Sequence, residues 1–207
     1  MKLFFIRHGK TEWNQQMRLQ GKTGDSALLP ESLDEIACLG DYLKQFEIET
    51  IYASPSLRAR RTAEIINQRR ELTLPIVYRE GLREWGLGDL EGTLIEEARA
   101  KHPEAMTNFR SDLSQYNPSA FGGETVTQVL ERFSRVVQIA MLENSGNVLF
   151  VSHGAALTAG INYLAGEPLH RLRNRGGLGN NTLSILNAEV FERPFTLEAW
   201  NDGAFLK

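Results

Sequence analysis

The chain opens with an apolar run, residues 3–6, that leads directly into Arg7, His8 and Gly9. Four consecutive apolar residues without polar alternation are typical of a strand buried on both faces, as in the middle of a parallel sheet. A glycine directly after such a strand ends it and lets the backbone approach a ligand closely. Because open α/β sheets bind ligands at the carboxyl ends of their strands, we expect Arg7 and His8 at an anion site, with phosphate as the anion that best explains the pair.

A second segment, residues 147–151, repeats this pattern, since its apolar strand runs into Ser152, His153 and Gly154. If the two strands are neighbours, the imidazoles of His8 and His153 face each other across one pocket. A histidine attacks phosphorus only when it is neutral, and nearby arginines disfavour its protonation. A single histidine at a strand end is more often structural than catalytic, but the repeated context favours a catalytic pair.

Strand and helix patterns alternate along the chain without a linker or repeat. This order predicts an α/β fold, a three-layer sandwich with a mainly parallel central sheet and helices on both faces, in a single domain over residues 1–207. Helices are expected over 31–46, 54–69, 93–101, 124–143 and 155–164. Further strands are expected over 50–53 and 74–78, followed by short antiparallel strands at one sheet edge over 180–186, 189–191 and 195–200.

Composition narrows the class of protein. The 42% hydrophobic content can fill a sizeable core, and the net charge of −3 argues against a basic nucleic-acid-binding surface. No apolar run is long enough to span a bilayer, and the first residues predict a strand instead of a secretion signal. The single cysteine, Cys38, cannot form an internal disulfide. We therefore expect a cytoplasmic protein with neither a nucleic-acid nor a membrane partner.

Two further segments carry groups suited to phosphate chemistry. Residues 54–63 begin a helix directly after a strand, and a helix N-terminus favours anions. Arg58 lies in its first turn, where its planar fork of donors suits phosphate oxygens. Glu84 lies beside Trp85 in the glycine-rich stretch 81–92, and an apolar ring and a bound dianion would favour the acid form of a proton donor. The alternative for Glu84 is an ordinary loop glutamate in water.

Three other motifs are set aside. Gly21-Lys22-Thr23 resembles the end of a P-loop but lacks its first glycine at position 16. Cys38 does not have the arginine six residues later that a cysteine phosphatase would need, and its helical position is one where a buried thiol is common. The four histidines show no metal-ligand spacing, so no metal site is expected.

Five blocks, in this order along nearly the whole chain, resemble the histidine phosphatase superfamily, which includes the cofactor-dependent phosphoglycerate mutases. The blocks are residues 7–14, 54–63, 82–92, 122–125 and 151–154, and residues 180–184 resemble the closing strand of that family. The resemblance implies a phosphoglycerate mutase-like fold.

The resemblance also implies residue roles. His8 would be the nucleophile that becomes phosphohistidine, and Glu84 would protonate the departing oxygen and then activate water. Arg7, Arg58 and His153 would complete the catalytic set by holding the phosphoryl oxygens. The substrate-binding residues would be Arg7, Asn14, Gly21, Arg58 and His153. No metal is implied, because the arginines supply the positive charge.

The family implies an enzyme, and two reactions lead. The first is hydrolysis of a small phosphomonoester through phosphohistidine on His8, without a cofactor. The alternative is a cofactor-dependent phosphoglycerate mutase, which would use 2,3-bisphosphoglycerate. The short segment 85–92 after Glu84 resembles the phosphatases of the family, while a degenerate phosphate-binding module is disfavoured by the intact site.

The expected partner is a small phosphorylated metabolite, and the sequence leaves a homodimer open. The outer wall of the pocket should come from residues 96–121, where Phe109, Arg110, Tyr116 and Phe121 would contact the organic part of a substrate or serve only in helix packing.

Overall fold

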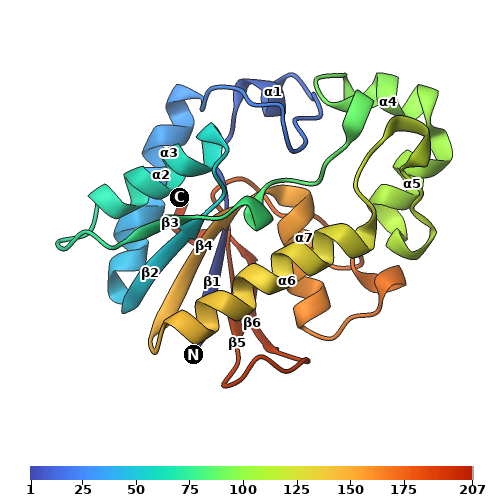
Figure 1. Cartoon of the computed structure of the whole chain (residues 1–207). Coiled ribbons are helices and arrows are strands. Elements are labelled where there is room, and N and C mark those ends of the chain that lie inside the picture. Colours follow the sequence, from blue (N-terminus) through green and yellow to red (C-terminus); the bar gives the residue numbers. More distant parts are fainter. Residues whose placement is uncertain (207) are drawn as a thin grey trace.

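A six-stranded sheet with strand order β3-β2-β4-β1-β5-β6 forms the centre of the molecule (Figure 1). The computed structural model describes residues 1–206. The strands are β1 (Lys2–Arg7), β2 (Ile48–Ala53), β3 (Ile76–Tyr78), β4 (Asn147–Ser152), β5 (Leu183–Asn187) and β6 (Thr196–Asp202).

The register of the two central strands brings the ends of β1 and β4 together. They pair in parallel, with Arg7 opposite Ser152. The residues that follow, His8 and His153, therefore leave the sheet side by side. The sequence predicts β1 in the middle of a parallel sheet. In the structure β1 has a parallel partner on one side only, because β5 pairs with it in the antiparallel direction. The sheet is still mainly parallel, since β1, β2, β3 and β4 run the same way.

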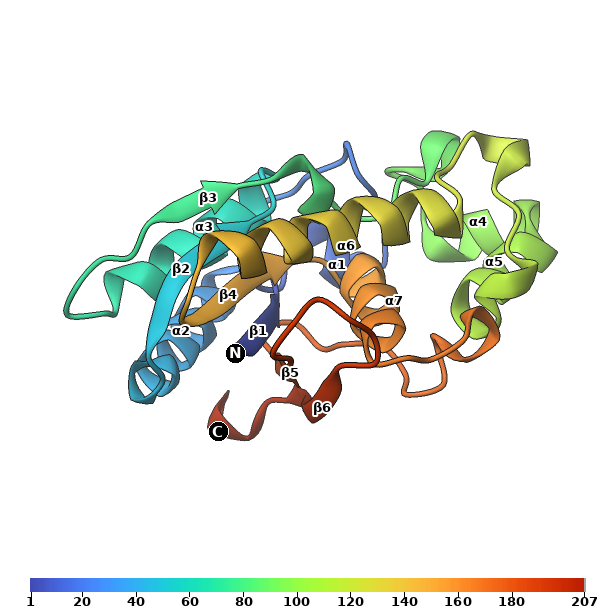
Figure 2. The same ribbon diagram turned by 60° about the horizontal axis from the view of Figure 1, so that its bottom comes forward.

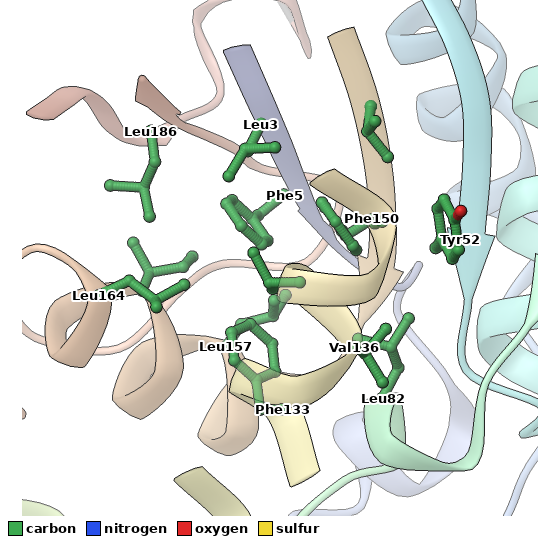
Figure 3. Close-up of a cluster of buried hydrophobic side chains, with 14 of the residues drawn as sticks. Leu3, Phe5, Tyr52, Leu82, Phe133, Val136, Phe150, Leu157, Leu164 and Leu186 are labelled. Atoms are coloured by element: carbon green, nitrogen blue, oxygen red, sulfur yellow. The ribbon is translucent and has the colours of Figure 1, made fainter. Parts of the chain in front are cut away.

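Helices cover both faces of the sheet, as predicted. On one face lie α2 (Pro30–Tyr42) and α3 (Leu57–Gln68), and on the other lie α6 (Val126–Glu143) and α7 (Gly154–Leu164) (Figures 1 and 2). Figure 3 shows the second face, where Phe133 of α6 and Leu157 of α7 pack toward Phe5 and Phe150. The rings of Phe5 and Phe150 stack with centroids 4.9 Å apart, which joins the two strands that carry the histidines.

A separate cap projects beyond the end of the sheet, at the upper right of Figure 1. It contains α4 (Ile95–Lys101) and α5 (Pro103–Ser111), and its core is built around Trp85, which contacts the rings of Phe109 and Tyr116 edge-on. Helix α5 is not among the helices expected from the sequence, because a proline that follows a helix usually marks its end, whereas Pro103 is also the first residue of α5. The remaining helical segments are α1 (Glu12–Gln15) and 3-10 turns at Leu43–Gln45, Glu80–Leu82, Gly88–Leu90, Leu113–Gln115, Ser119–Phe121, Leu169–Arg171 and Ala204–Leu206.

Three local expectations were wrong. Cys38 is exposed, because Ile36 and Leu39 occupy the buried face of α2 and position 38 points away from it. The helix expected from residue 54 begins at Leu57, since Ser54 still donates its N–H to the Val151 carbonyl. Residues 189–191 form an irregular connection between β5 and β6 instead of a strand.

Candidate active site

His8 lies at the carboxyl end of β1 with a ring that is almost fully buried. Its Nδ1 is 2.7 Å from the Gly9 carbonyl oxygen, and a carbonyl only accepts, so Nδ1 carries the proton. The lone pair therefore lies on Nε2, where the Arg58 Nε–H donates to it at 3.3 Å. Burial, helped by the positive charges of Arg58 and Arg7, holds the pKa of His8 well below its ordinary value. The ring is therefore neutral at physiological pH, with its lone pair on Nε2.

His153 meets His8 as the repeated pattern predicted, with ring centroids 5.1 Å apart and an edge-to-face arrangement. Its Nε2 lies 2.7 Å from the Ser54 Oγ, while its Nδ1 is buried without a hydrogen-bond partner. Burial, together with the charge of Arg58, holds the pKa of His153 well below its ordinary value. This residue is fully buried and is not among those that line the cleft, so it supports the site from within the protein.

Arg58 lies in the first turn of α3 and is only 1% exposed. Its terminal nitrogens donate to the carbonyls of Gly24 at 2.8 Å and Gly21 at 3.0 Å, and Asp25 forms an ion pair with it at 3.0 Å. These contacts fix the guanidinium plane against the His8 ring. Gly21, which was predicted to line the site, does so and also holds Arg58 through its carbonyl.

Arg7 contributes the second guanidinium of the cleft. Its Nη1 donates to the Leu178 carbonyl, and its Nε is buried without a partner. Burial lowers the pKa of Arg7, although the nearby Glu84 carboxylate opposes that change. A Cβ at Gly154 would lie 3.0 Å from the Arg7 Nε, so the glycine after His153 leaves the room this side chain needs.

Glu84 is held at the N-terminus of α7. Its carboxylate accepts backbone N–H groups from Ala156 at 2.8 Å, Ala155 at 3.0 Å and its neighbour Trp85 at 2.8 Å. Such donors stabilise a negative charge. The three bonds hold the Glu84 carboxylate in place where it lines the cleft.

These side chains meet in a cleft of about 440 Å³. It brings together the following residues predicted for the site: Arg7, His8, Asn14, Gly21, Arg58 and Glu84. Asn14 is held by Asn180, whose side-chain amide also donates to the His8 carbonyl at 2.9 Å. Of the predicted outer wall, Phe109 and Arg110 line the cleft, whereas Tyr116 and Phe121 are buried in the core of the cap.

Sequence reasoning missed several residues of the cleft wall. They are Arg18, Leu19, Gln20, Leu87, Ile95, Thr158, Arg173 and residues 176–178. The resemblance to the family offered a signal only for the stretches near residues 14 and 88. No sequence signal marked Arg173, because it lies in an arginine-rich segment, residues 171–175, and such a composition is typical of an exposed surface.

No group of three or more His, Cys, Asp or Glu side chains within residues 1–206 is placed to hold a metal ion. No helix in the same residues is long and apolar enough to cross a membrane.

A neutral histidine and two guanidinium groups at the carboxyl edge of a mainly parallel sheet define an α/β enzyme of phosphoryl chemistry. The sequence model of the histidine phosphatase superfamily (branch 1) matches residues 3–203, and the chain belongs to this superfamily. The predicted family and phosphoglycerate mutase-like fold are thus confirmed.

Relatives in the family include both phosphatases and mutases. The chain is 32% identical over 201 residues to a Bacillus subtilis protein named uncharacterized phosphatase PhoE, covering 97% of this chain and 94% of that protein. It is 31% identical over 183 residues to a probable phosphoglycerate mutase GpmB of Escherichia coli, covering 84% and 81%.

Solved structures agree. Bacillus stearothermophilus YhfR superimposes with a TM-score of 0.90 at 30% identity, covering 100% of this chain and 99% of that one. A mycobacterial glucosyl-3-phosphoglycerate phosphatase in complex with VO3 gives a TM-score of 0.87 at 26% identity, covering 97% and 98%.

Proposed function

We propose that the chain is a phosphatase that hydrolyses a small phosphomonoester through a phosphohistidine intermediate on His8. The observation that carries this proposal is the state of the His8 ring. Its proton is fixed on Nδ1 by the Gly9 carbonyl, and its Nε2 lone pair meets the Arg58 guanidinium in an open cleft. A phosphoryl group held by Arg58 would lie against the one ring nitrogen that can attack it.

In the first step, the His8 Nε2 attacks phosphorus and the bond from phosphorus to the ester oxygen breaks. Arg7 and Arg58 stabilise the charge on the phosphoryl oxygens, while His153 packs against the His8 ring from within the protein. Glu84, in its acid form, gives its proton to the departing oxygen. General acid catalysis of this kind contributes about 10²- to 10⁴-fold in rate.

In the second step, Glu84 is a carboxylate and takes a proton from water as that water attacks the phosphorus. The bond between phosphorus and Nε2 breaks, which releases inorganic phosphate and restores the neutral His8 ring. In both steps Glu84 transfers the proton, and Arg7 and Arg58 supply the positive charge. The proposed hydrolytic route therefore uses no cofactor.

The alternative is a phosphoglycerate mutase, and the identity to proteins named as mutases favours it. Both reactions share the first step and differ in what accepts the phosphoryl group from His8. The phosphatase route is supported by the PhoE relative, which is 32% identical to this chain over 201 residues, whereas a GpmB protein of Erwinia tasmaniensis is 27% identical over the same length.

The test compares the wild type with His8→Ala in the hydrolysis of p-nitrophenyl phosphate, with His170→Ala as the control because His170 is an exposed histidine. We expect no turnover above background for His8→Ala, normal turnover for the control, and an acid-labile phosphoenzyme only where His8 is present. Turnover by His8→Ala would reject the nucleophile.

A second assay supplies 3-phosphoglycerate with and without 2,3-bisphosphoglycerate. Isomerisation that depends on the bisphosphate and releases little phosphate would make the chain a mutase. Binding of phosphate esters without turnover of any of them would instead identify a degenerate binding module.

A further inference from the structure

The peptide groups on either side of Gly9 lie just beyond the end of the sheet. The N–H of His8 still pairs with β4, where it donates to the Ser152 carbonyl at 3.0 Å. The next two N–H groups, those of Gly9 and Lys10, donate to side-chain hydroxyls instead. A buried N–H group requires a partner, and here two helices on one face of the sheet supply it, through one residue of α2 and one of α3.

Thr62 of α3 holds the first of these peptide groups. Its Oγ1 accepts the Gly9 N–H at 3.0 Å and donates its own proton to the Arg58 carbonyl at 2.8 Å, one turn earlier in the helix. Because the hydroxyl proton is used within the helix, the oxygen acts as an acceptor toward Gly9. The Thr62 side chain is fully buried. The end of β1 is thereby linked to the helical turn that carries Arg58.

Ser32 of α2 holds the second peptide group. Its Oγ accepts the Lys10 N–H at 2.7 Å and the side-chain amide of Asn181 at 3.0 Å. Ser32 is fully buried, and a Cβ at Gly9 would lie 2.6 Å from its Oγ. The hydroxyl can therefore reach the Lys10 N–H because position 9 is a glycine.

These bonds determine where the Gly9 carbonyl points. In a trans peptide the C=O and the N–H point in opposite directions, so the bond from the Lys10 N–H to Ser32 turns the Gly9 C=O to the other side. That carbonyl is the acceptor for the His8 Nδ1 at 2.7 Å. A glycine adopts many backbone conformations and does not fix this plane by itself. The position of the proton on His8 therefore depends on side chains from two other elements.

We propose that Thr62 and Ser32 are positioning residues: their hydroxyls orient the peptide groups that keep the His8 proton on Nδ1 and present Nε2 to phosphorus. The inference rests on the proposed phosphatase function. Without the hydroxyls the Gly9 carbonyl turns away, and the neutral ring can carry its proton on Nε2, which then has no lone pair for attack. The Arg58 Nε–H also favours a lone pair on Nε2, but its bond of 3.3 Å is longer than that to Gly9.

Thr62 offers a matched pair of variants. Thr62→Val removes the hydroxyl and keeps the β-branched shape, whereas Thr62→Ser keeps the hydroxyl. The first should lower kcat for p-nitrophenyl phosphate by about 10- to 100-fold, because misplacement of a reacting group costs about that much in rate, and the second should stay within about 3-fold of the wild type. Ser32→Ala should also lower kcat by about 10- to 100-fold. Inhibition by inorganic phosphate should be unchanged, since other contacts hold the Arg58 side chain.

The tautomer of His8 is a readout that a loss of stability alone would not change. NMR of nitrogen-labelled histidine distinguishes the protonated from the unprotonated ring nitrogen, and His8→Ala assigns the signals of His8 by removing them. The wild type and Thr62→Ser should carry the proton on Nδ1. Thr62→Val and Ser32→Ala should show a mixture that includes the Nε2–H form.

Thr50→Val and Ser134→Ala are the controls. Thr50 is a buried threonine outside the cleft, and its hydroxyl donates to the Asn144 side chain at 2.6 Å. The Ser134 Oγ is buried without a hydrogen-bond partner in the part of the chain that the structure describes. Thr50→Val should lower the melting temperature and Ser134→Ala should not, while both should leave kcat and the His8 tautomer unchanged.

Unchanged kcat and an unchanged Nδ1–H signal in Thr62→Val and Ser32→Ala would overturn the inference, as would equal losses of kcat in Thr62→Ser and Thr62→Val. If Thr62→Val does not fold, Ser32→Ala decides, because it acts on the neighbouring peptide group from a different helix. The proposed function fails separately, through turnover of p-nitrophenyl phosphate by His8→Ala. A protein with His8-dependent hydrolysis that keeps its rate in these variants would retain the function and lose this inference.

Discussion

Glu91 and Arg58 bind the same loop, residues 21–24, through complementary groups. The Glu91 carboxylate accepts the three backbone N–H groups of residues 22–24, at 2.8, 2.9 and 3.2 Å. Arg58 donates to the first and last carbonyls of the loop. Burial opposes ionisation of Glu91, but hydrogen bonds, led by that from Thr23, outweigh it and lower the pKa of this carboxyl. Glu91 thus orients Arg58, and through it the His8 ring, without touching either.

Glu91→Gln should therefore impair catalysis although the residue is remote from the reacting atoms. An amide cannot accept from all the loop donors, so the Arg58 carbonyl partners would shift, and misplacement near a reacting group costs about 10- to 100-fold in rate. We expect kcat for p-nitrophenyl phosphate to fall by that factor, with partial rescue in Glu91→Asp. Glu71→Gln, at an exposed glutamate, is the control. If Glu91→Gln lowered the melting temperature but left kcat unchanged, Glu91 would have only a structural role.

A second carboxylate holds the segment that carries Glu84. Glu124 pairs with Arg132 at 2.8 Å, and Arg132 donates to the carbonyls of Gly81, Arg83 and Glu84. Both partners are only 16% exposed. Removing one partner of a buried pair costs about 3–5 kcal/mol, and we expect about 2–3 kcal/mol for Arg132→Gln because this pair retains some solvent screening. Urea unfolding measures this change, and a loss below about 1 kcal/mol would contradict the role given to the pair.

The positions of His8 and His153 were predictable because each histidine follows a buried strand, and a buried strand is recognisable in the sequence as an apolar run. The apolar runs of β1 and β4 marked where His8 and His153 emerge, and the parallel register then placed them side by side. The apolar runs do not show that these two strands are neighbours. Only the strand order of the sheet places the two histidine rings next to each other. Arg58 and Glu84 owed their roles to the family resemblance, and their positions in the cleft agree with it.

Other residues could not be placed because burial depends on distant partners. Arg173 stands in a polar segment, and its environment comes from Phe109 of the cap, 64 residues earlier. Cys38 shows the reverse, since helical periodicity identifies an apolar stripe but not how far around the helix the neighbouring layer reaches. Local patterns therefore located the elements, and only tertiary contacts could show which side chains they bury.

The two site histidines should make the protein less stable in mild acid. Their pKa values are lower in the folded protein than in the unfolded chain, so below about pH 6.5 the unfolded chain binds more protons and the free energy of unfolding falls as the pH falls. Above that pH their contribution is constant. Between pH 7 and 5.5 each ring should cost about 1 kcal/mol, and carboxylates add little in this range.

Urea unfolding at the two pH values, in buffer without phosphate, measures this loss. The difference should shrink by about half in His8→Asn or His153→Asn and remain unchanged in His170→Asn, because His170 is exposed. A loss of the same size in all four proteins would show that other groups titrate.

The close approach of α6 and α7 depends on Gly160. A Cβ built at this position would lie 2.4 Å from the ring of Phe133, which is fully buried beneath the sheet (Figure 3). Gly160→Ala gains about 1 kcal/mol in helix propensity, but overpacking costs about 1–3 kcal/mol, and a ring enclosed on all sides places the cost toward the upper end. We expect a net loss of stability of up to about 2 kcal/mol in urea unfolding.

The partner of that clash can be tested directly by a double-mutant cycle. Phe133→Leu alone should destabilise the protein through a cavity, yet in its background Gly160→Ala should be neutral or stabilising, because the smaller side chain makes room for the methyl group. Gly177→Ala is the control, since a Cβ there meets nothing within 4 Å. Additive effects of the two substitutions would mean that the helices separate to admit the methyl group, and the glycine would then not determine how closely α7 approaches α6.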